Sequence, residues 1–425
     1  MLTINRQREE TQSRLTLLAK ILRLKDLKIT AFAFQQRDTE LHLWVKPFKN
    51  GCRCPKCERR CPIVRQAQEA RSWEDVAILG RKVLFWYAPK EIVCPTHGLV
   101  QERIPWAAPY ARITYRLEFR ICALCQIMTQ KAAAEILKMA PSTLSNCLHR
   151  VITRVRTGHK IRGLVTLGAD EIAYCKGRKY ATIIYDLDRS RVAWVGQGKG
   201  RETIDRFFNE SLSERQRLKI KWASCDMSRA YTGAIQHHCP NATLVIDRFH
   251  VVKALNEALD VVRKDEWRGL DKRGRQAIKG LRWMLGMHAR NRSKKQSRFL
   301  NALRTSNRRI HRAWVLKDEF ERIWHFTYPG AARQFLKRWM TAALRSRLPS
   351  LKTFVTTVRN HFENILSFIE RPLTNAVGEG INRLLKIVKN RASGFRGLEP
   401  FADLIFLTIG DLDIPAHIPS DLRTL

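Results

Sequence analysis

Two aspartates occupy positions where a buried strand would otherwise hold an uncharged side chain. Asp170 lies within the strand-like segment "TLGADEIAY", next to the small residue Gly168, which would let a ligand or another backbone approach closely. Asp226 ends the segment "LKIKWASCD", in phase with the apolar residues Leu218 and Trp222. A carboxylate on an apolar strand face is unfavourable unless a cation neutralises it. We therefore expect both aspartates to bind a divalent metal; the alternative for each is a turn or surface residue.

A third acid stands alone in a basic segment. Glu379 is the only acidic residue among residues 373–397, "LTNAVGEGINRLLKIVKNRASGFRG". Helical periodicity places it on one face with Asn382, Arg383 and Lys386. One interpretation is a solvated face with an ion pair between Glu379 and Arg383. The other is an acid directed at a metal ion, with the polar and basic neighbours binding a DNA strand. The apolar stripe of this helix is expected to contain Val377, Ile381, Leu384, Leu385 and Val388.

Together, these three acids would support phosphoryl transfer. Three carboxylates that meet at one point can hold two Mg2+ or Mn2+ ions roughly 3.5–4 Å apart. Such a pair of ions activates a nucleophile and stabilises both oxygens of an in-line displacement. Water as the nucleophile gives strand cleavage, whereas a DNA 3′-hydroxyl gives strand joining.

Another group of chemistry-bearing residues consists of two short knuckles. Cys54 and Cys57 form a Cys-x-x-Cys pair, and Cys94 and His97 form a matching Cys-x-x-His pair, each with a proline after its first cysteine. Two such pairs supply the four ligands of a tetrahedral, structural Zn2+ site. The alternating segments "LHLWV" and "KVLFWYA" predict short strands that carry the knuckles. The alternative is a small basic β domain with reduced cysteines.

The remaining cysteines give weaker indications. Cys52 and Cys61 flank the first knuckle, so the choice of its two ligands stays open. Cys122 and Cys125 lie in a helical pattern, where cysteines three residues apart are usually buried, small apolar side chains. Eleven cysteines in a reducing compartment are not expected to form a disulfide framework.

Helical periodicity in residues 110–155 is broken at "KMAPS". A helix over residues 132–137, a short turn, and a second helix that Ser142 caps or opens have the spacing of a helix-turn-helix. The second helix of that motif enters the DNA major groove. An ordinary helical hairpin is the alternative. The residues expected to reach bases or phosphates are Thr143, Ser145, Asn146 and Arg150.

Charge favours nucleic acid as the partner. The 425 residues include 78 Lys and Arg against 39 Asp and Glu, a net charge of +39 that is spread along the chain. A protein that neutralises many phosphates needs such a field, whereas an enzyme for a small neutral substrate does not. The N-terminus lacks a signal peptide, no apolar run is long enough to span a bilayer, and "GQGKGRE" is not a phosphate-binding P-loop. We therefore expect an intracellular protein that uses no membrane and no ATP.

The segment from residue 161 to 262 contains the elements that would position the two aspartates. Its patterns indicate three consecutive strands, a helix, a strand, a helix, a strand and a long amphipathic helix, which is the order of the RNase H-like core. In that core the helix with Glu379 would lie against the strands that bear Asp170 and Asp226. The 379 − 226 = 153 positions between Asp226 and Glu379 exceed what the core needs, and the excess is helical and very basic. The tryptophans expected in the core of this excess are Trp267, Trp283, Trp314, Trp324 and Trp339.

The order of these segments resembles the bacterial insertion-sequence DDE transposases of the IS-L-three group. The most specific segments are "DRFHVVK" and "TNAVGEGINRLLK", and the resemblance extends over roughly residues 27–407. It implies that Asp170, Asp226 and Glu379 form the catalytic triad. Glu171 is the rival for the first position, because strand parity cannot be fixed to one residue from sequence.

The same resemblance marks Asp247 and His250 as accessory residues near the active site, the alternative being a helix cap and a core histidine. It implies that the helical excess is an inserted domain that clamps DNA. The implied partners are double-stranded DNA, as terminal inverted repeats and as target, and further copies of the chain in a homodimer or higher oligomer. The implied location is the bacterial cytoplasm, in association with the nucleoid.

These observations predict a multi-domain α/β fold, in which an RNase H-like catalytic core is interrupted by an all-α insertion and preceded by a zinc-binding β domain and a helix-turn-helix. We expect a Mg2+- or Mn2+-dependent transposase with one structural Zn2+. Two other functions fit parts of the sequence: a DNA-binding regulator without catalysis, and an RNase H-like nuclease or resolvase that never joins strands. The predicted domains are the zinc-binding domain 1–108, the helix-turn-helix 109–160, the core 161–262 and 371–412, the insertion 263–370, and the tail 413–425.

Overall fold

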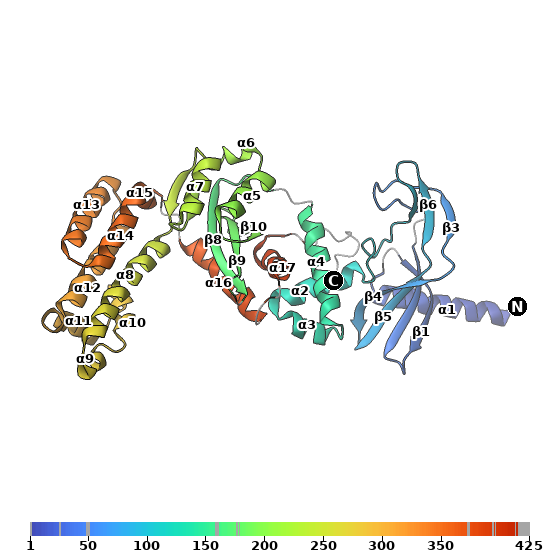
Figure 1. The fold of residues 1–425 in the computed structure, drawn as a ribbon. Coiled ribbons are helices and arrows are strands. Elements are labelled where there is room, and N and C mark those ends of the chain that lie inside the picture. Colours follow the sequence, from blue (N-terminus) through green and yellow to red (C-terminus); the bar gives the residue numbers. More distant parts are fainter. Residues whose placement is uncertain are drawn as a thin grey trace. The chain divides into compact units, whose positions relative to one another are not determined.

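The computed structural model of the protein divides into two compact units, one of residues 1–159 with 402–425 and one of residues 160–401. Figure 1 shows the helices and strands of both. No helix in the part of the chain that the structure describes is long and apolar enough to cross a membrane. The described residues are 2–24, 27–47, 52–157, 161–175, 177, 179–371, 375–392, 395, 397–412 and 414; the side chains of 2–11, 277, 375, 376 and 379 lie outside this description.

Two sheets form the β part of the first unit. The larger has the strand order β1-β2-β5-β4, with β2 and β5 parallel, and the smaller is antiparallel with the order β3-β6-β7. One face of the larger sheet is buried with residues of α1 and with Trp106, and it contributes Leu43 and Phe85 to that core. The bounds are α1 Leu2–Ile21, β1 Leu27–Gln35, β2 Glu40–Pro47, β3 Ile63–Gln66, β4 Arg71–Ile78, β5 Arg81–Tyr87, β6 Lys90–Cys94 and β7 Gly98–Gln101.

The predicted strands "LHLWV" and "KVLFWYA" are confirmed within β2 and β5, but the prediction that they carry the knuckles is wrong. The second knuckle begins at the end of β6, and the first precedes β3, so both belong to the smaller sheet. Pro89 separates β5 from β6. Because proline has no N–H to donate, it ends the ladder of β5 and lets the chain start a strand in the second sheet.

The helical part of the first unit contains α2 (Tyr115–Ile127), α3 (Gln130–Ile136) and α4 (Pro141–Thr157). Arg116 of α2 is buried, pairs with Asp75 of β4, and donates from Nη1 to the carbonyl of Leu22 at 2.6 Å. This contact fixes the helices to the larger sheet. The predicted pair of helices is confirmed as α3 and α4, and Ser142 lies in the first turn of α4 because that helix begins at Pro141.

The C-terminal helix α17 (Leu398–Ile409) contributes to the helical part of the first unit. The Gln126 amide of α2 donates to the carbonyl of Leu407 at 3.1 Å, and His149 Nδ1 of α4 lies 2.9 Å from Asp403 Oδ2. The described residues of α17 from 402 onward therefore belong to the same unit as α2 and α4. The finer domain boundaries predicted from the sequence stay predictions.

A five-stranded sheet with the order β10-β9-β8-β11-β12 forms the centre of the second unit. β8, β9 and β10 form an antiparallel meander, whereas β11 and β12 run parallel to β8. Phe207 of α5 and Tyr231 of α7 are buried with Ala169 and Ala223 of the sheet. The predicted order of strands and helices is confirmed. The bounds are β8 Thr166–Cys175, β9 Lys179–Asp186, β10 Arg191–Gln197, α5 Arg201–Ser211, α6 Glu214–Arg217, β11 Trp222–Cys225, α7 Arg229–His238 and β12 Thr243–Ile246.

The strand that leads to Asp226 is shorter than predicted. Leu218 is not in a strand but at the end of α6, where its N–H donates to the Glu214 carbonyl at 3.0 Å, and it is 44% exposed. The N–H groups of Leu218 and Ile220 donate back to the Glu214 and Arg217 carbonyls, so these alternating residues continue the turns after α6 and do not form a strand. Asp226 therefore follows a four-residue strand, β11, instead of ending a long one.

Helices fill the chain between β12 and the segment that bears Glu379, as far as the structure describes it (Figure 1). The first, α8 (Arg248–Gly269), shares one buried core with the helices that follow. Trp314, Trp324 and Trp339 lie in this core as expected, but Trp283 is 78% exposed. The short α10 buries Leu281 and Leu285, which leaves Trp283 on its other side. The remaining bounds are α9 Lys272–Ala277, α10 Leu281–Gly286, η1 Ala289–Asn291, α11 Lys294–Ser306, α12 Arg308–Phe320, η2 Glu321–His325, α13 Pro329–Arg345, α14 Pro349–Asn360, α15 Phe362–Glu370 and α16 Asn375–Arg391.

Candidate active site and metal centre

Three aspartates lie at one level of the central sheet. In the parallel pairing of β8 with β11, Ser224 is opposite Gly168, so two further residues along each chain Asp226 reaches the level of Asp170. In the pairing of β11 with β12, Cys225 is opposite Ile246, and the next residues are Asp226 and Asp247. The register of three neighbouring parallel strands thus brings these carboxylates to one edge, where the chains of β11 and β12 leave the sheet.

Asp170 is held by a hydrogen-bonded chain that begins on the neighbouring strand. The Tyr185 hydroxyl donates to Asn382 Oδ1 at 3.1 Å, and Asn382 Nδ2 donates to Asp170 Oδ2 at 3.0 Å. Asn382 belongs to α16, so this amide joins the helix to the sheet. Gly168 makes room for the ring of Tyr185, because a Cβ atom there would lie 3.0 Å from that ring. The small residue predicted to permit a close approach therefore permits a tyrosine ring.

The two predicted accessory residues also lie beside Asp170. Asp247 caps α8 by accepting from the Phe249 N–H at 2.9 Å. His250, in the first turn of α8, places Nε2 3.9 Å from Asp170 Oδ1 and 4.0 Å from Asp247 Oδ2. Asp247 thus caps the helix, as the alternative interpretation held, and both residues also lie beside Asp170.

Electrostatics distinguishes the neighbours Asp170 and Glu171. Burial raises the pKa of Asp170, and the negative charge of Asp247 adds to this rise; His250, the Glu171 N–H and Asn382 oppose it. Glu171 is exposed, and its pKa is raised by partial burial and by repulsion from Asp226 and Asp170. Asp170, not Glu171, receives the hydrogen bond from α16. Both acids lie in a field that is already negative, which is the environment that a divalent cation relieves.

Glu379 lies in α16, one helical turn before Asn382. The prediction for its side chain falls outside the described part of the structure. Asn382, three residues later in the same helix, contacts Asp170.

The rest of α16 follows the sequence pattern with one exception. Ile381, Leu385 and Val388 are buried, as predicted for the apolar stripe. Leu384 is 40% exposed, because it lies at the edge of that stripe beside the exposed Arg383. Arg383 and Lys386 are exposed, and the prediction that they contact DNA stays a prediction, as it does for Asn382.

The first unit contains a separate group of metal-ligand atoms. One ligand atom from each of Cys54, Cys57, Cys94 and His97 lies within 4.8 Å of all the others. The Sγ atoms of Cys57 and Cys94 are 3.6 Å apart, and His97 Nδ1 lies 3.6 Å from Cys54 Sγ and 3.5 Å from Cys94 Sγ. Zinc bonds of about 2.0–2.3 Å in a tetrahedron require similar separations between ligands. These residues form a cluster that can hold a metal ion.

Hydrogen bonds within the second knuckle favour the Cys94 thiolate. Burial raises the pKa of the Cys94 thiol, but the N–H groups of Thr96 and His97 oppose this and lower it to about 7. Cys52 and Cys61, which the sequence left as possible ligands, lie outside the four-residue group. Burial raises the pKa of Cys52 to about 12, and the Cys61 thiol donates to the Arg59 carbonyl at 3.3 Å. The expectation that Cys122 and Cys125 are buried apolar side chains is confirmed.

The predicted DNA-contacting residues of α4 divide into two sets. Thr143 and Asn146 are exposed and Ser145 is half-buried, whereas Leu144 and Leu148 between and beyond them are buried. Arg150 instead donates to the buried carboxylate of Glu118, at 3.3 and 3.4 Å. Arg154 binds the other oxygen of Glu118 at 2.7 Å. Arg150 thus helps to fix α4 on α2.

Sequence patterns did not identify Tyr185 and did not assign Asn382 its contact with Asp170. Both contacts depend on long-range pairing: residues 185 and 382 are 197 positions apart, and 170 and 382 are 212 apart. A polar residue one turn after the candidate acid of a helix was the only signal in the sequence, and that signal is equally typical of a solvated face.

Comparison with known families identifies the class. Residues 167–405 match a family described as a transposase, of the DDE type of family ISL3, and residues 102–152 match the helix-turn-helix domain of transposase family ISL3. The first match spans the central sheet, the helices after it and α16, and the second spans α2, α3 and most of α4. The fold and site are therefore those of a transposase with a DDE-family domain and a DNA-binding helix-turn-helix domain.

Two proteins that match most of the chain indicate which kind of transposase it is. The transposase for insertion sequence element IS1001 of Bordetella parapertussis is 33% identical over 368 residues, 85% of this chain and 89% of that protein. The transposase for insertion sequence element IS1557 of Mycobacterium tuberculosis is 25% identical over 382 residues, 84% of this chain and 85% of that protein. The chain belongs to transposase family ISL3, a family of insertion-sequence transposases. Among solved structures, the Drosophila P element transposase strand transfer complex covers 70% of this chain and 92% of its own, with 9% identity and a TM-score of 0.38, a likeness too remote to bear on function.

Proposed function

We propose that this transposase cuts DNA at the ends of its own element and joins the freed ends to target DNA, using Asp170, Asp226 and Glu379 as a catalytic triad on an RNase H-like core. The observation that carries this proposal is the contact between Asn382 and Asp170. It ties the helix of Glu379 to the strand of the first aspartate, at the level that Asp226 shares through the strand register.

The donor set fits a divalent cation. Carboxylate oxygens are the ligands that Mg2+ and Mn2+ prefer, and the raised pKa of Asp170 shows that its surroundings, acidic and partly dehydrated, favour a neutral group unless a cation is bound. We infer that Asp170, Asp226 and Glu379 would hold two such ions. When bound, the ions activate water or a 3′-hydroxyl and stabilise the leaving oxygen. Asn382 orients Asp170, and His250 is placed to contact a phosphate beside it.

Binding of element ends is assigned to the exposed face of α4, through Thr143, Ser145 and Asn146, which would enter the major groove of the terminal inverted repeats. Arg383 and Lys386 of α16 are exposed near the acids and would bind the phosphates of the strand that is cut. One structural Zn2+ on Cys54, Cys57, Cys94 and His97 would hold the smaller sheet together. Two ends must be held at once, so we expect the protein to act as a dimer or higher oligomer.

The test is an excision assay in cells that carry a marker between the native flanks of the element. The intact protein should excise the marker, and Glu379→Gln should abolish excision while binding of the flanks survives, because an amide cannot replace the charge that holds the metal. Glu399→Gln changes an exposed acid of α17 and is the matched control, which should excise normally. Excision by Glu379→Gln at the normal rate would remove this residue from the triad.

The same assay separates the alternative functions. A regulator without catalysis would bind the flanks in both forms and excise in neither. A nuclease or resolvase would cut the flanks without producing joined products in purified reactions with target DNA. Joined products that depend on Mg2+ or Mn2+ and on Glu379 exclude both.

A further inference from the structure

A flat group of aromatic rings lies on the face of the larger N-terminal sheet that is opposite its core. Trp44 of β2 pairs in register with Trp86 of β5, and their rings are inclined by only 20° with centroids 6.4 Å apart. The His42 ring is inclined to Trp86 by 16°, and the indole Nε1–H donates to His42 Nδ1 at 2.9 Å. The planes of the His42 and Trp44 rings are thus each close to parallel with that of Trp86, and are inclined to each other by 37°; we call these three residues the aromatic platform: His42, Trp44 and Trp86.

The orientation of the platform is fixed by polar contacts. His42 Nε2 lies 3.0 Å from Glu40 Oε2, while Nδ1 accepts from Trp86. The carboxylate therefore selects the histidine tautomer that can accept the indole N–H. His42 is 5% exposed, whereas Trp44 and Trp86 are only partly buried. A side chain that only covers a sheet needs no such chain of contacts, but a surface that must stay flat for a ligand benefits from it.

The edge strand leaves the Trp44 indole uncovered on one side. On β1 the residue opposite Trp44 is Ala31, which is too small to cover the indole ring. Lys28 and its register partner Lys46 are exposed at the end of this edge. On this side the platform is thus bordered by a small side chain, and two lysines lie at the end of the strand pair.

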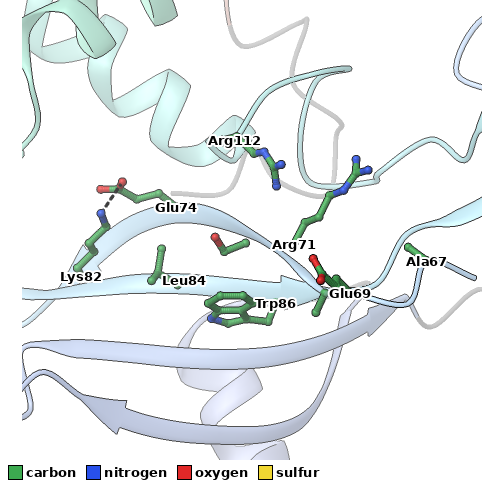
Figure 2. A pocket seen from close by; sticks show the side chains of 10 residues that line it. Ala67, Glu69, Arg71, Glu74, Lys82, Leu84, Trp86 and Arg112 are labelled. Atoms are coloured by element: carbon green, nitrogen blue, oxygen red, sulfur yellow. Dashed lines mark ion pairs between the residues drawn. The ribbon is translucent and has the colours of Figure 1, made fainter.

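A groove of about 600 Å³ borders the platform on its other side, with Leu84 and Trp86 in its lining. Figure 2 shows Arg71, Arg112 and Trp86 among the side chains that line this groove, and Glu74 paired with Lys82 at 3.0 Å. Arg71 donates to Gln101 at 3.0 Å, and neither arginine has an ion pair with an acid among the described residues. Glu69 also lines the groove, so the two arginines provide a local, not a uniform, positive field.

We propose that the aromatic platform binds unpaired bases of a DNA strand, with phosphates of that strand bound by Arg71 and Arg112. A base in a duplex has its faces covered by its neighbours, so only an unpaired base can stack on a fixed indole surface. Guanidinium groups beside the stacking surface supply the charge-assisted hydrogen bonds that a phosphate needs. The net charge of +39 repels a basic partner such as a basic peptide and attracts an anionic strand. This site is separate from the helix-turn-helix and from the acids, and cutting and joining of DNA ends is a reaction in which unpaired ends arise.

The experiment measures binding of a labelled single-stranded oligonucleotide to the full-length, zinc-loaded protein by fluorescence anisotropy. Trp86→Leu and Trp44→Leu should each weaken single-strand binding by roughly tenfold, as expected for loss of one stacking surface. Trp44→Tyr keeps an aromatic ring and should retain most of the affinity. Phe32→Ala is the matched control, because Phe32 is a 43% exposed ring on the other face of the same sheet. For the charges, Arg71→Gln with Arg112→Gln is compared with Arg37→Gln, an exposed arginine in the β1–β2 turn.

Photocrosslinking with bromodeoxyuridine in the strand identifies the residues that touch the bases. Crosslinks to peptides that contain Trp44 or Trp86, together with the loss of affinity in their variants and unchanged duplex binding, support the proposal. Equal losses for single strands and duplexes would overturn it in favour of a backbone contact. Wild-type affinity in folded Trp86→Leu and Trp44→Leu proteins, or crosslinks confined to other segments, would also overturn it. Because only binding is measured, these outcomes do not depend on the catalytic triad.

Discussion

The two candidate metal sites of the molecule differ in how their ligand atoms are arranged. In the first unit, four soft ligand atoms from two knuckles already lie within 4.8 Å of one another. In the second unit the acids lie on separate strands, Asp170 within β8 and Asp226 and Asp247 just after β11 and β12, and no comparable group of acids occurs among the residues that the structure describes. A structural site closes on its ion, whereas a catalytic site must leave positions for substrate oxygens. The difference indicates that the Zn2+ ion would stabilise the fold of the smaller sheet, whereas the divalent ions of the second unit would bind together with DNA.

The largest effect should come from breaking the closed site. Cys54→Ser removes one of four zinc ligands and should unfold the smaller sheet, because the binding energy of a structural Zn2+, on the order of 10 kcal/mol, is also folding energy. Elemental analysis should find no bound zinc, and end binding should be lost. Cys61→Ser is the control in the same sheet and should keep its zinc, since Cys61 lies outside the ligand group. Full zinc content in Cys54→Ser would refute the assignment.

A ligand of the open site should affect chemistry without affecting the fold. Asp226→Asn should lower strand cleavage by about a hundredfold or more. Loss of a residue that only hydrogen-bonds a metal ligand already lowers activity by up to about a hundredfold, and loss of a ligand should cost at least as much. The Asn side chain keeps an oxygen that can accept from the Ser228 N–H, which Asp226 Oδ1 now does at 2.9 Å. Gel assays of cleavage and of end binding in Mg2+ measure the two effects separately. Retained cleavage would place Asp226 outside the site.

A smaller loss is expected when the orientation of a ligand is disturbed. Asn382→Ala removes the hydrogen bond to Asp170 and should reduce cleavage by roughly 10- to 100-fold. Raising the Mg2+ or Mn2+ concentration should recover part of this loss, which a change in DNA contact would not do. Tyr185→Phe removes only the hydroxyl that orients Asn382, so its effect should be in the same direction and weaker.

The smallest effect concerns stability in the absence of metal. The pKa of Asp170 is raised in the folded protein, so its contribution to stability is present at low pH and is lost as pH rises through that pKa. In buffer without Mg2+ or Mn2+, Asp170→Asn should therefore melt above the wild type at neutral pH, by roughly 2–4 °C for each kcal/mol gained, and the gap should narrow in acid. Added Mg2+ should raise the melting temperature of the wild type alone. Glu210→Gln, an exposed acid of α5, should show no such pH dependence.

The same contrast explains what could be predicted from the sequence. The members of the Cys/His cluster are paired within four residues of each other, so local spacing was sufficient to predict that they lie together. The strand and helix order of the core was also predictable, because each element has its own periodicity. The contact of Asn382 with Asp170 was not, since it depends on how a distant helix packs on a strand. Trp283 and Leu384 were misplaced because a residue at the edge of an apolar stripe has the same sequence signature as one within it.

The helix that begins at Asp247 has a mechanical consequence. α8 continues without interruption for 22 residues, about 33 Å, from the acidic edge of the sheet into the group of helices that precedes α16. The core and the helical part are thus joined by a continuous helix and not by a loop. A displacement of the far helices would therefore be passed along α8 to the turn that carries Asp247 and His250.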